Sequence, residues 1–202
     1  MLVEEILHQI TFPPTSFLQK ALNALWRWQV AQNFLREMPL IRTASVLEIG
    51  CGSGYLIKRL ARVVRRGRVV GIDLSERRIR RAMRRCVGLE NVEFYVGAAE
   101  MLPWETDSFD YVTCLDSFYE YPNPGIALTE MRRVLKPGGK LFHGVRGHQE
   151  KNGARRGWRF LLNFVPDGYA PEEYVRYFEH SGFLGVRQKL TPDYLLTIGM
   201  KA

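Results

Sequence analysis

The sequence predicts an α/β fold with a doubly wound, mostly parallel sheet of seven strands, preceded by helices and closed by an antiparallel C-terminal hairpin. Three observations lead to this prediction. Apolar strand-like runs alternate with helical patterns from residue 46 onward, a glycine-rich loop follows the first run, and a three-residue link joins the last two runs. Strands separated by crossover helices pair in parallel, whereas so short a link permits only an antiparallel pair.

The N-terminal segment has helical patterns over residues 1–10 and about 15–38. Pro13-Pro14 ends the first helix, and Thr15 or Ser16 can cap the second. Apolar residues recur along one face of the second helix, at Leu18, Ala21, Leu22, Leu25 and Trp28. Such a face must pack against another part of the chain.

The sheet and its helices follow in alternation. Strands are expected near residues 46–50, 69–73, 92–96, 109–115 and 139–145, with helices near 54–65, 75–87 and 123–136 between them. Pro171 marks the first turn of a further helix, because proline is favoured at the first helical position. The last two strands, about 184–190 and 194–201, meet at Thr191-Pro192-Asp193.

Composition excludes several classes of protein. Hydrophobic residues make up 46% of the chain and charged residues 25%, which is typical of a globular domain. No run of about 18 apolar residues is present, and the acidic start does not match a secretory signal, so we expect a cytoplasmic protein. Cys51, Cys86 and Cys114 are odd in number and lack Cys-x-x-Cys spacing, so neither a disulfide framework nor a metal site is indicated.

The net charge of +8 is compatible with a polyanionic partner such as nucleic acid. Whether such a partner is indicated depends on where the basic residues cluster. Much of the excess lies in one predicted helix, as Arg77, Arg78, Arg80, Arg81, Arg84 and Arg85. Apolar residues at helical spacing form its other face: Ile79, Ala82, Met83, Cys86 and Val87. We favour a solvated helix face, because such runs are common without partners, and binding of a polyanion stays open.

The glycine-rich loop directly follows the first strand, as Gly50, Gly52 and Gly54. In an open parallel sheet, ligands bind beyond the carboxyl ends of the strands, where the strand order reverses. Glycines there let a ligand approach the backbone amides and permit unusual backbone angles. The sequence therefore predicts a ligand site at this loop.

The spacing of the glycines restricts the ligand. A dinucleotide fingerprint would place a glycine at position 55, where Tyr55 stands, so NAD is disfavoured, and the phosphate loop of nucleotide triphosphatases is absent. Asp73 ends the second strand about 20 residues further on, where an acid can accept both ribose hydroxyls. Alternatively, Asp73 caps the helix that starts at Ser75.

Four ordered motifs make the chain resemble the class I S-adenosylmethionine-dependent methyltransferases. They are Val46-Leu47-Glu48-Ile49-Gly50-Cys51-Gly52-Ser53-Gly54, Gly71-Ile72-Asp73-Leu74-Ser75, Leu102-Pro103-Trp104 with Asp107-Ser108-Phe109-Asp110-Tyr111-Val112, and residues 130–141, which contain Pro137-Gly138-Gly139. The resemblance implies a Rossmann-like fold, S-adenosylmethionine as cofactor, and methyl transfer. It is closest to the small-molecule branch, the methyltransferase type 11 or quinone-biosynthesis-like enzymes.

The resemblance also implies the cofactor-binding residues. They are Glu48, Gly50, Cys51, Gly52, Gly54, Tyr55, Asp73, Leu74, Ala98, Ala99, Glu100 and Leu115. The glycine loop would approach the methionine part, Asp73 the ribose, residues 98–101 the adenine, and residues 114–117 the transferred methyl group. Glu48 would orient the loop or the ammonium group, unless it caps nearby amides. Ala98 departs from the family, which commonly has an Asp there for the adenine amino group. Unless water or Glu100 substitutes, weaker cofactor binding or a rearranged adenine pocket is expected.

One domain is expected over residues 1–202. It divides into an N-terminal helical cap (1–42), a cofactor-binding core (43–146), a substrate-side insertion (147–170), and a C-terminal helix with hairpin (171–202). In the related branch the acceptor site is walled by the N-terminal helices, the loop after strand four and the insertion. Aromatic residues are plentiful in these parts, although each can equally belong to the core: Phe17, Trp26, Trp28, Phe34, Phe118, Tyr119, Tyr121, Trp158, Phe160 and Phe164.

The acceptor is expected to be a small hydrophobic or aromatic molecule. The Asn/Asp-Pro-Pro-Tyr/Phe tetrapeptide and the Pro-Cys pair of nucleic-acid methyltransferases are absent. In-line displacement from a sulfonium requires a base only when the acceptor must lose a proton. The candidates for that role are Tyr119 and Glu120, with His143 and His148 behind them.

Three alternatives stay open. The basic surface could serve an RNA or protein methyltransferase, or the chain could be a non-catalytic module that binds the cofactor. Four arginines near the insertion could receive an anionic group of the acceptor or could equally be solvated: Arg146, Arg155, Arg156 and Arg159. If Arg156 and Arg159 lie on one helix with Trp158 and Phe160 opposite, that helix could rest on an anionic membrane. The oligomeric state is not encoded in a readable way.

Overall fold

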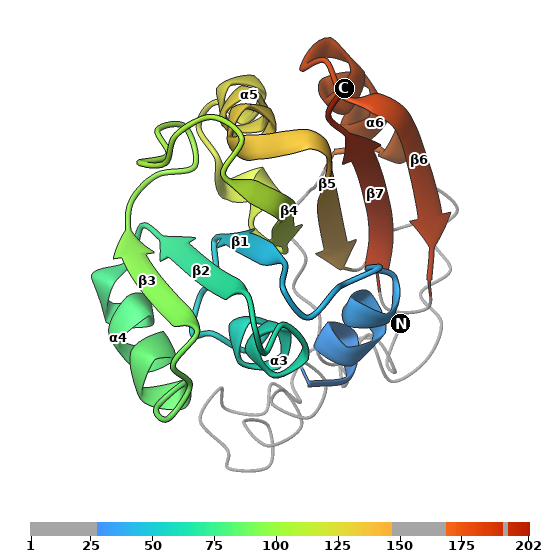
Figure 1. The fold of residues 1–202 in the computed structure, drawn as a ribbon. Coiled ribbons are helices and arrows are strands. Elements are labelled where there is room, and N and C mark those ends of the chain that lie inside the picture. Colours follow the sequence, from blue (N-terminus) through green and yellow to red (C-terminus); the bar gives the residue numbers. More distant parts are fainter. Residues whose placement is uncertain (1–27, 147–168, 192–193) are drawn as a thin grey trace, which may run out of the picture.

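The computed structural model of the chain describes residues 28–146, 169–191 and 194–202. Its centre is one seven-stranded sheet with the order β3-β2-β1-β4-β5-β7-β6 (Figure 1). The strands are β1 (Ser45–Ile49), β2 (Arg68–Asp73), β3 (Val92–Val96), β4 (Phe109–Leu115), β5 (Leu135–Arg146), β6 (Leu184–Leu190) and β7 (Tyr194–Met200). The first five pair in parallel, and β7 runs antiparallel to both β5 and β6. The predicted fold class is confirmed.

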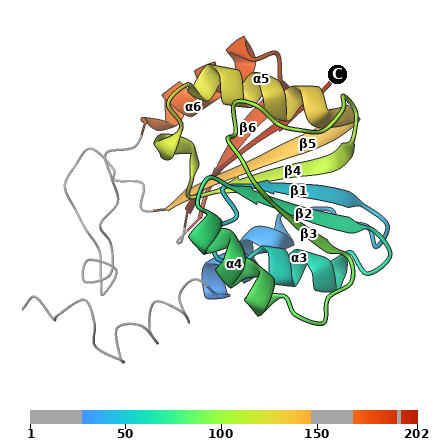
Figure 2. The same ribbon diagram turned by 90° about the vertical axis from the view of Figure 1, so that its left-hand side faces the viewer.

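Helices cover both faces of the sheet (Figure 2). On one face lie a helix over residues 28–36, α3 (Ile57–Val63) and α4 (Glu76–Arg85). On the other face lie α5 (Pro124–Val134) and α6 (Pro171–His180), while the short 3₁₀ helix η1 (Phe118–Glu120) follows β4. No helix in these described ranges is long and apolar enough to cross a membrane.

Two hydrophobic cores lie on opposite faces of the sheet, because successive strand residues point to opposite sides. In β1, Leu47 and Ile49 pack with the buried residues of α5 and α6. Val46 of the same strand packs with the buried residues of α3 and of the helix over 28–36. The strand alternation therefore sets which helices each strand residue contacts.

Two boundaries differ from the sequence prediction for local reasons. The helix expected from residue 54 begins at Ile57, because Gly54 has a φ of +75°, outside the helical region. The helix expected to reach residue 136 ends at Val134, and β5 begins at Leu135 rather than near 139. Pro137 disfavours a helical conformation for the residue before it, which ends α5 early.

The predicted apolar face of α4 is narrower than its spacing suggested. Ile79, Ala82 and Cys86 are buried against the sheet, as expected. Met83 and Val87 are 54% and 80% exposed, so their placement on the buried face was wrong. Met83 lies on the outer side of α4, and Val87 lies in the turn after the helix, which ends at Arg85. The helices expected at 1–10 and over most of 15–38 lie outside the described residues, although 28–36 is helical.

Candidate functional site

The glycine loop lies at the carboxyl end of β1, which is flanked by β2 and β4 in the sheet. This is the point where the strand order reverses and where open α/β sheets bind ligands. Gly50, Gly52 and Gly54 have φ angles of +67°, +56° and +75°, so each uses a conformation that side chains disfavour.

Only one of the three glycines faces open space. A Cβ at Gly50 would lie 2.4 Å from the Cβ of Ser117, and one at Gly54 would lie 3.0 Å from the Cβ of Ala82. At Gly52 no atom lies within 4 Å of that position. Gly50 and Gly54 thus make room for the chain itself, while Gly52 leaves room for another molecule.

Asp73 connects this loop to the start of α4. Its carboxylate is buried, and its Oδ2 accepts a hydrogen bond of 2.9 Å from the Gly52 amide. Its Oδ1 accepts one of 2.8 Å from the amide of Ser75, whose own Oγ caps α4 by accepting from the Arg78 amide. The carboxylate therefore holds the loop and the helix N-terminus in a fixed relation.

Glu48 is a buried acid beside the loop. It lies in β1 with 3% of its surface exposed, and its Oε2 has no hydrogen-bond partner among the described residues. Burial raises the pKa of Glu48 well above its ordinary value, a hydrogen bond from the Ile57 amide lowers it, and the charge of Asp73 raises it further. A cation placed next to Oε2 would offset the cost of ionising this carboxyl.

A hydrogen-bonded cluster lies under the loop. The Ser117 hydroxyl donates to the Ile49 carbonyl at 3.0 Å and lies 2.8 Å from the Tyr121 hydroxyl. The Cys114 thiol is 3.2 Å from both hydroxyl oxygens. Burial raises the pKa of Cys114 to about 11 and raises the pKa of Tyr121 well above its ordinary value. Both groups therefore keep their protons near neutral pH.

The two residues predicted to be catalytic lie on η1, directly after β4. Tyr119 is partly buried against the core of α5 and α6. Glu120 is 52% exposed, and its Oε2 lies 3.7 Å from a guanidinium nitrogen of Arg78. The same nitrogen is 3.9 Å from Oδ2 of Asp73, so Arg78 spans the distance between the two acids.

His143 lies in the core and not on the surface of the site. Its ring packs against Phe118 and Tyr174, with centroids 5.0 and 4.7 Å away. Neither ring nitrogen has a partner among the described residues, and burial lowers the pKa of His143 to about 3. His148, the other histidine considered, lies outside the described residues.

The loops beside Asp73 place the residues expected near adenine. Leu74 is 67% exposed, Ala98 is half-buried, and Ala99 is buried in the core. The Oε1 of Glu100 accepts a hydrogen bond of 3.3 Å from the backbone amide of Asn123, the N-cap of α5. Residue 98 therefore has no acidic side chain of its own, and the nearby Glu100 carboxylate is held toward the start of α5.

The remaining predicted cofactor residues have side chains that pack within the protein. The Cys51 thiol is buried against β2, and a Cβ added at Gly71 would lie only 2.9 Å from its sulfur. The guanidinium of Arg85 lies over the Tyr55 ring, with its Cζ 3.4 Å from the ring centroid. Leu115 packs against the core that contains α3. These three residues can meet a ligand mainly through their backbones.

The aromatic residues expected around the acceptor divide into groups. Phe34 and Phe118 are fully buried core residues, and Trp28 is 49% exposed with the Arg59 guanidinium over its ring. Tyr119 and Tyr121 are partly buried beside Phe118. The others lie outside the described residues: Phe17, Trp26, Trp158, Phe160 and Phe164.

Sequence reasoning missed a contribution from the start of α6. Tyr169 and Tyr177 pack edge-on against Phe118, with centroids 5.9 and 6.0 Å away, and Tyr174 packs on the same ring. Tyr174 and Tyr177 are three residues apart, so the sequence could have predicted that they lie on the same face of α6. Its contact with the loop after β4 required the tertiary structure.

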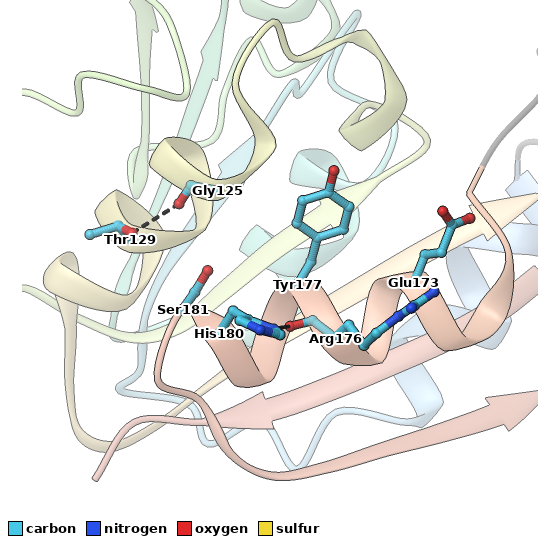
Figure 3. A pocket seen from close by; sticks show the side chains of 7 residues that line it. All are labelled: Gly125, Thr129, Glu173, Arg176, Tyr177, His180 and Ser181. Carbon is cyan, nitrogen blue, oxygen red and sulfur yellow. Dashed lines mark hydrogen bonds between the residues drawn. The ribbon is translucent and has the colours of Figure 1, made fainter.

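A separate pocket of about 560 Å³ lies between α5 and α6 (Figure 3). Its lining comes from these two helices and the residue after α6, and includes Thr129, Glu173, Tyr177 and His180. None of its residues belongs to the glycine loop or to β2. It is therefore distinct from the site at Asp73.

Comparison with known sequences agrees with this geometry. The family model described as a methyltransferase domain matches residues 46–139, which contain the glycine loop, Asp73 and the loop after β4. Demethylmenaquinone methyltransferase of Staphylococcus aureus is 37% identical over 118 residues, covering 58% of this chain and 47% of that protein. The chain thus spans about half the length of the relatives that it matches.

Solved structures share the fold over most of the chain. A chain from the complex that contains the Haloferax volcanii Trm112 methyltransferase activator matches with a TM-score of 0.72 and 26% identity, covering 90% of this chain and 92% of that chain. A SAM-dependent methyltransferase of Aquifex aeolicus matches with a TM-score of 0.69 and 22% identity, covering 85% and 89%.

Proposed function

We propose that this chain, which belongs to the class I S-adenosylmethionine-dependent methyltransferases, transfers a methyl group to a small hydrophobic or aromatic acceptor. The observation that carries the proposal is the buried Oε2 of Glu48, which lacks a donor among the described residues. A buried acceptor without a partner is costly, so a ligand that brings a cationic donor is the expected complement.

The residues at the loop fit the cofactor. Glu48 would accept a hydrogen bond from the ammonium group of the methionine part, whose charge would stabilise the ionised carboxylate. Each Asp73 oxygen accepts one backbone amide and keeps a second lone pair for a ribose hydroxyl. The open side of Gly52 would let the ligand lie against the backbone.

When bound, S-adenosylmethionine supplies an electrophilic methyl group on a sulfonium. The task of the chain is then to align the acceptor and exclude water. Cys114 and Tyr121 are not suited to act as bases, because burial raises both pKa values. If the acceptor must lose a proton, exposed Glu120 and its neighbour Tyr119 are the proposed groups on η1.

The aromatic cluster supports a hydrophobic acceptor. Phe118, Tyr121 and Tyr169 gather beside the loop after β4, next to the Gly50 end of the glycine loop. The Staphylococcus aureus relative is named for demethylmenaquinone, and an acceptor of that quinone class would suit these rings. We therefore propose a quinone or a similar aromatic metabolite as the acceptor class.

The test is transfer of labelled methyl groups from S-adenosylmethionine to a short-chain naphthoquinol, to total RNA and to a protein extract. Label in the organic extract of the naphthoquinol reaction is the expected result. Label in RNA or protein alone would replace the small-molecule acceptor with a macromolecular one. Absence of S-adenosylmethionine binding by calorimetry would remove the proposal altogether.

A further inference from the structure

The positive charge of the chain is concentrated on the two helices that follow β1 and β2, and on the few residues directly after each helix. Residues 57–66 and 76–87 hold 11 of the 29 Lys and Arg residues but only one of the 21 Asp and Glu residues. The rest of the chain holds the other 18 basic and 20 acidic residues, so it is slightly negative. We call the basic side chains of residues 58–66 and 77–85 the arginine face.

The fold leaves much of this charge unneutralised. On α4, Arg80 pairs with Glu76 of the same helix. Arg62, Arg81 and Arg84 form no ion pair with another described residue, and the last two are exposed on α4. The pKa of Arg59 is lowered, first by burial and then by the charges of Arg62 and Arg85. Arg59 and Arg85 both contact Tyr55, so like charges from α3 and α4 lie close together there.

Exposed aliphatic side chains lie among these arginines. Arg80, Met83 and Arg84 are exposed on one side of α4, at helical i, i+3, i+4 spacing. Val87 is exposed in the turn that follows the helix. Met83 is 54% exposed, Val87 80%, and Val63 on α3 41%. Binding at the surface of an anionic bilayer combines electrostatic attraction to the lipids with burial of apolar side chains, and this surface offers both kinds of group.

We propose that the arginine face binds the surface of a membrane that contains anionic lipids, with Met83 and Val87 inserted between the headgroups. The proposal rests on the proposed function to this extent, that a hydrophobic acceptor would be found in the bilayer. α3 starts just after the glycine loop and α4 just after Asp73, so both helices begin at the edge that holds the candidate site.

Single-stranded nucleic acid fits this surface less well. Proteins that bind it stack the bases on exposed aromatic rings. Here the Tyr55 ring is covered by Arg85, and the ring of Trp28 has the Arg59 guanidinium 5.5 Å from its centroid. The exposed apolar side chains beside the arginine face, Val63, Met83 and Val87, are aliphatic, which suits lipid chains better than bases.

The experiment is co-sedimentation of the full chain with vesicles of phosphatidylcholine alone or mixed with phosphatidylglycerol. We expect binding to the mixed vesicles about tenfold or more tighter, falling as salt is raised, because each arginine near an anionic surface contributes independently. Arg81→Gln with Arg84→Gln should weaken it about tenfold. Met83→Ser with Val87→Ser should also weaken it, while leaving the net charge unchanged.

The matched control is Arg176→Gln with Arg187→Gln, which removes the same charge from exposed positions on α6 and β6. The proposal would be overturned if this control lost as much vesicle binding as Arg81→Gln with Arg84→Gln. Equal binding of the parent protein to both vesicle types would also overturn it. So would tighter binding to single-stranded RNA that is insensitive to the Met83 and Val87 changes. Vesicle binding is measured without cofactor or acceptor, so its failure would leave the proposed methyl transfer standing, and the reverse also holds.

Discussion

The Ser117 side chain fills the space that a Cβ at Gly50 would occupy. Its Oγ lies 2.5 Å from that position and donates to the carbonyl of Ile49, the residue before Gly50. Ser117 comes from the loop after β4, so this contact joins the two loops that border the candidate site. The glycine loop is therefore shaped by the chain itself at Gly50 and is open at Gly52.

This difference between two glycines predicts different effects of the same substitution. Gly50→Ala should lower the free energy of unfolding by about 2–4 kcal/mol, because it adds a clash to the strain of a positive φ. Gly52→Ala should cost only about 1–2 kcal/mol from backbone strain, but should weaken cofactor binding. Urea unfolding and calorimetric titration measure the two effects. Equal loss of stability in both variants would contradict the assignment of open space to Gly52.

Asp73→Asn should weaken binding of S-adenosylmethionine by about 1–3 kcal/mol, since one acceptor oxygen and the charge are lost beside the ribose site. Calorimetry at constant pH measures this change. The matched control is Asp107→Asn, an exposed aspartate that pairs with Lys201 at the other end of β4. If Asp73→Asn binds as tightly as the control, Asp73 does not contact the cofactor.

Because burial raises the pKa of Glu48, we expect the stability of the cofactor-free protein to depend on pH. A carboxyl whose pKa is raised by folding holds more protons in the folded state, so stability falls as the pH rises from its unfolded pKa through its folded pKa. Glu48→Gln removes this titration and keeps the shape. The variant should match the parent near pH 4 and become progressively more stable than the parent as the pH rises above that.

Denaturant unfolding across this pH range checks the prediction, with Glu100→Gln as a control for an acid that is less buried. A constant difference in stability between parent and Glu48→Gln would mean that folding does not change the pKa of Glu48. Saturating S-adenosylmethionine should reverse the order near neutral pH, because the parent alone can pair with the ammonium group.

Ala98→Asp should tighten cofactor binding by about 1 kcal/mol if the adenine amino group lies near residue 98, because it supplies the missing acceptor. Ala98→Val adds similar bulk without an acceptor and should not tighten it. Unchanged or weaker affinity for the aspartate variant would indicate that adenine is held elsewhere. Glu100 accepts one hydrogen bond, from the Asn123 amide, which holds its carboxylate toward the start of α5.

The order and type of the elements could be predicted from sequence, because strand and helix periods, proline and glycine act over a few residues. The strands at 92–96 and 109–115 were placed correctly at both ends, and Pro171 marked the start of α6. The start of α3 and the end of α5 were placed less well. They depend on the backbone conformation of single residues, the positive φ of Gly54 and the extended conformation of Leu135, which the helical period does not encode.

By itself, then, the sequence determined the sheet, the glycine loop and the acid that follows β2. Only the tertiary structure decided which glycine is open, that Glu48 carries a buried oxygen without a partner, and that Met83 and Val87 face outward among arginines. The reason is physical: these properties arise where distant segments meet. Ser117 is far from Gly50 along the chain and α3 is separate from α4, so neither contact leaves a local pattern to read.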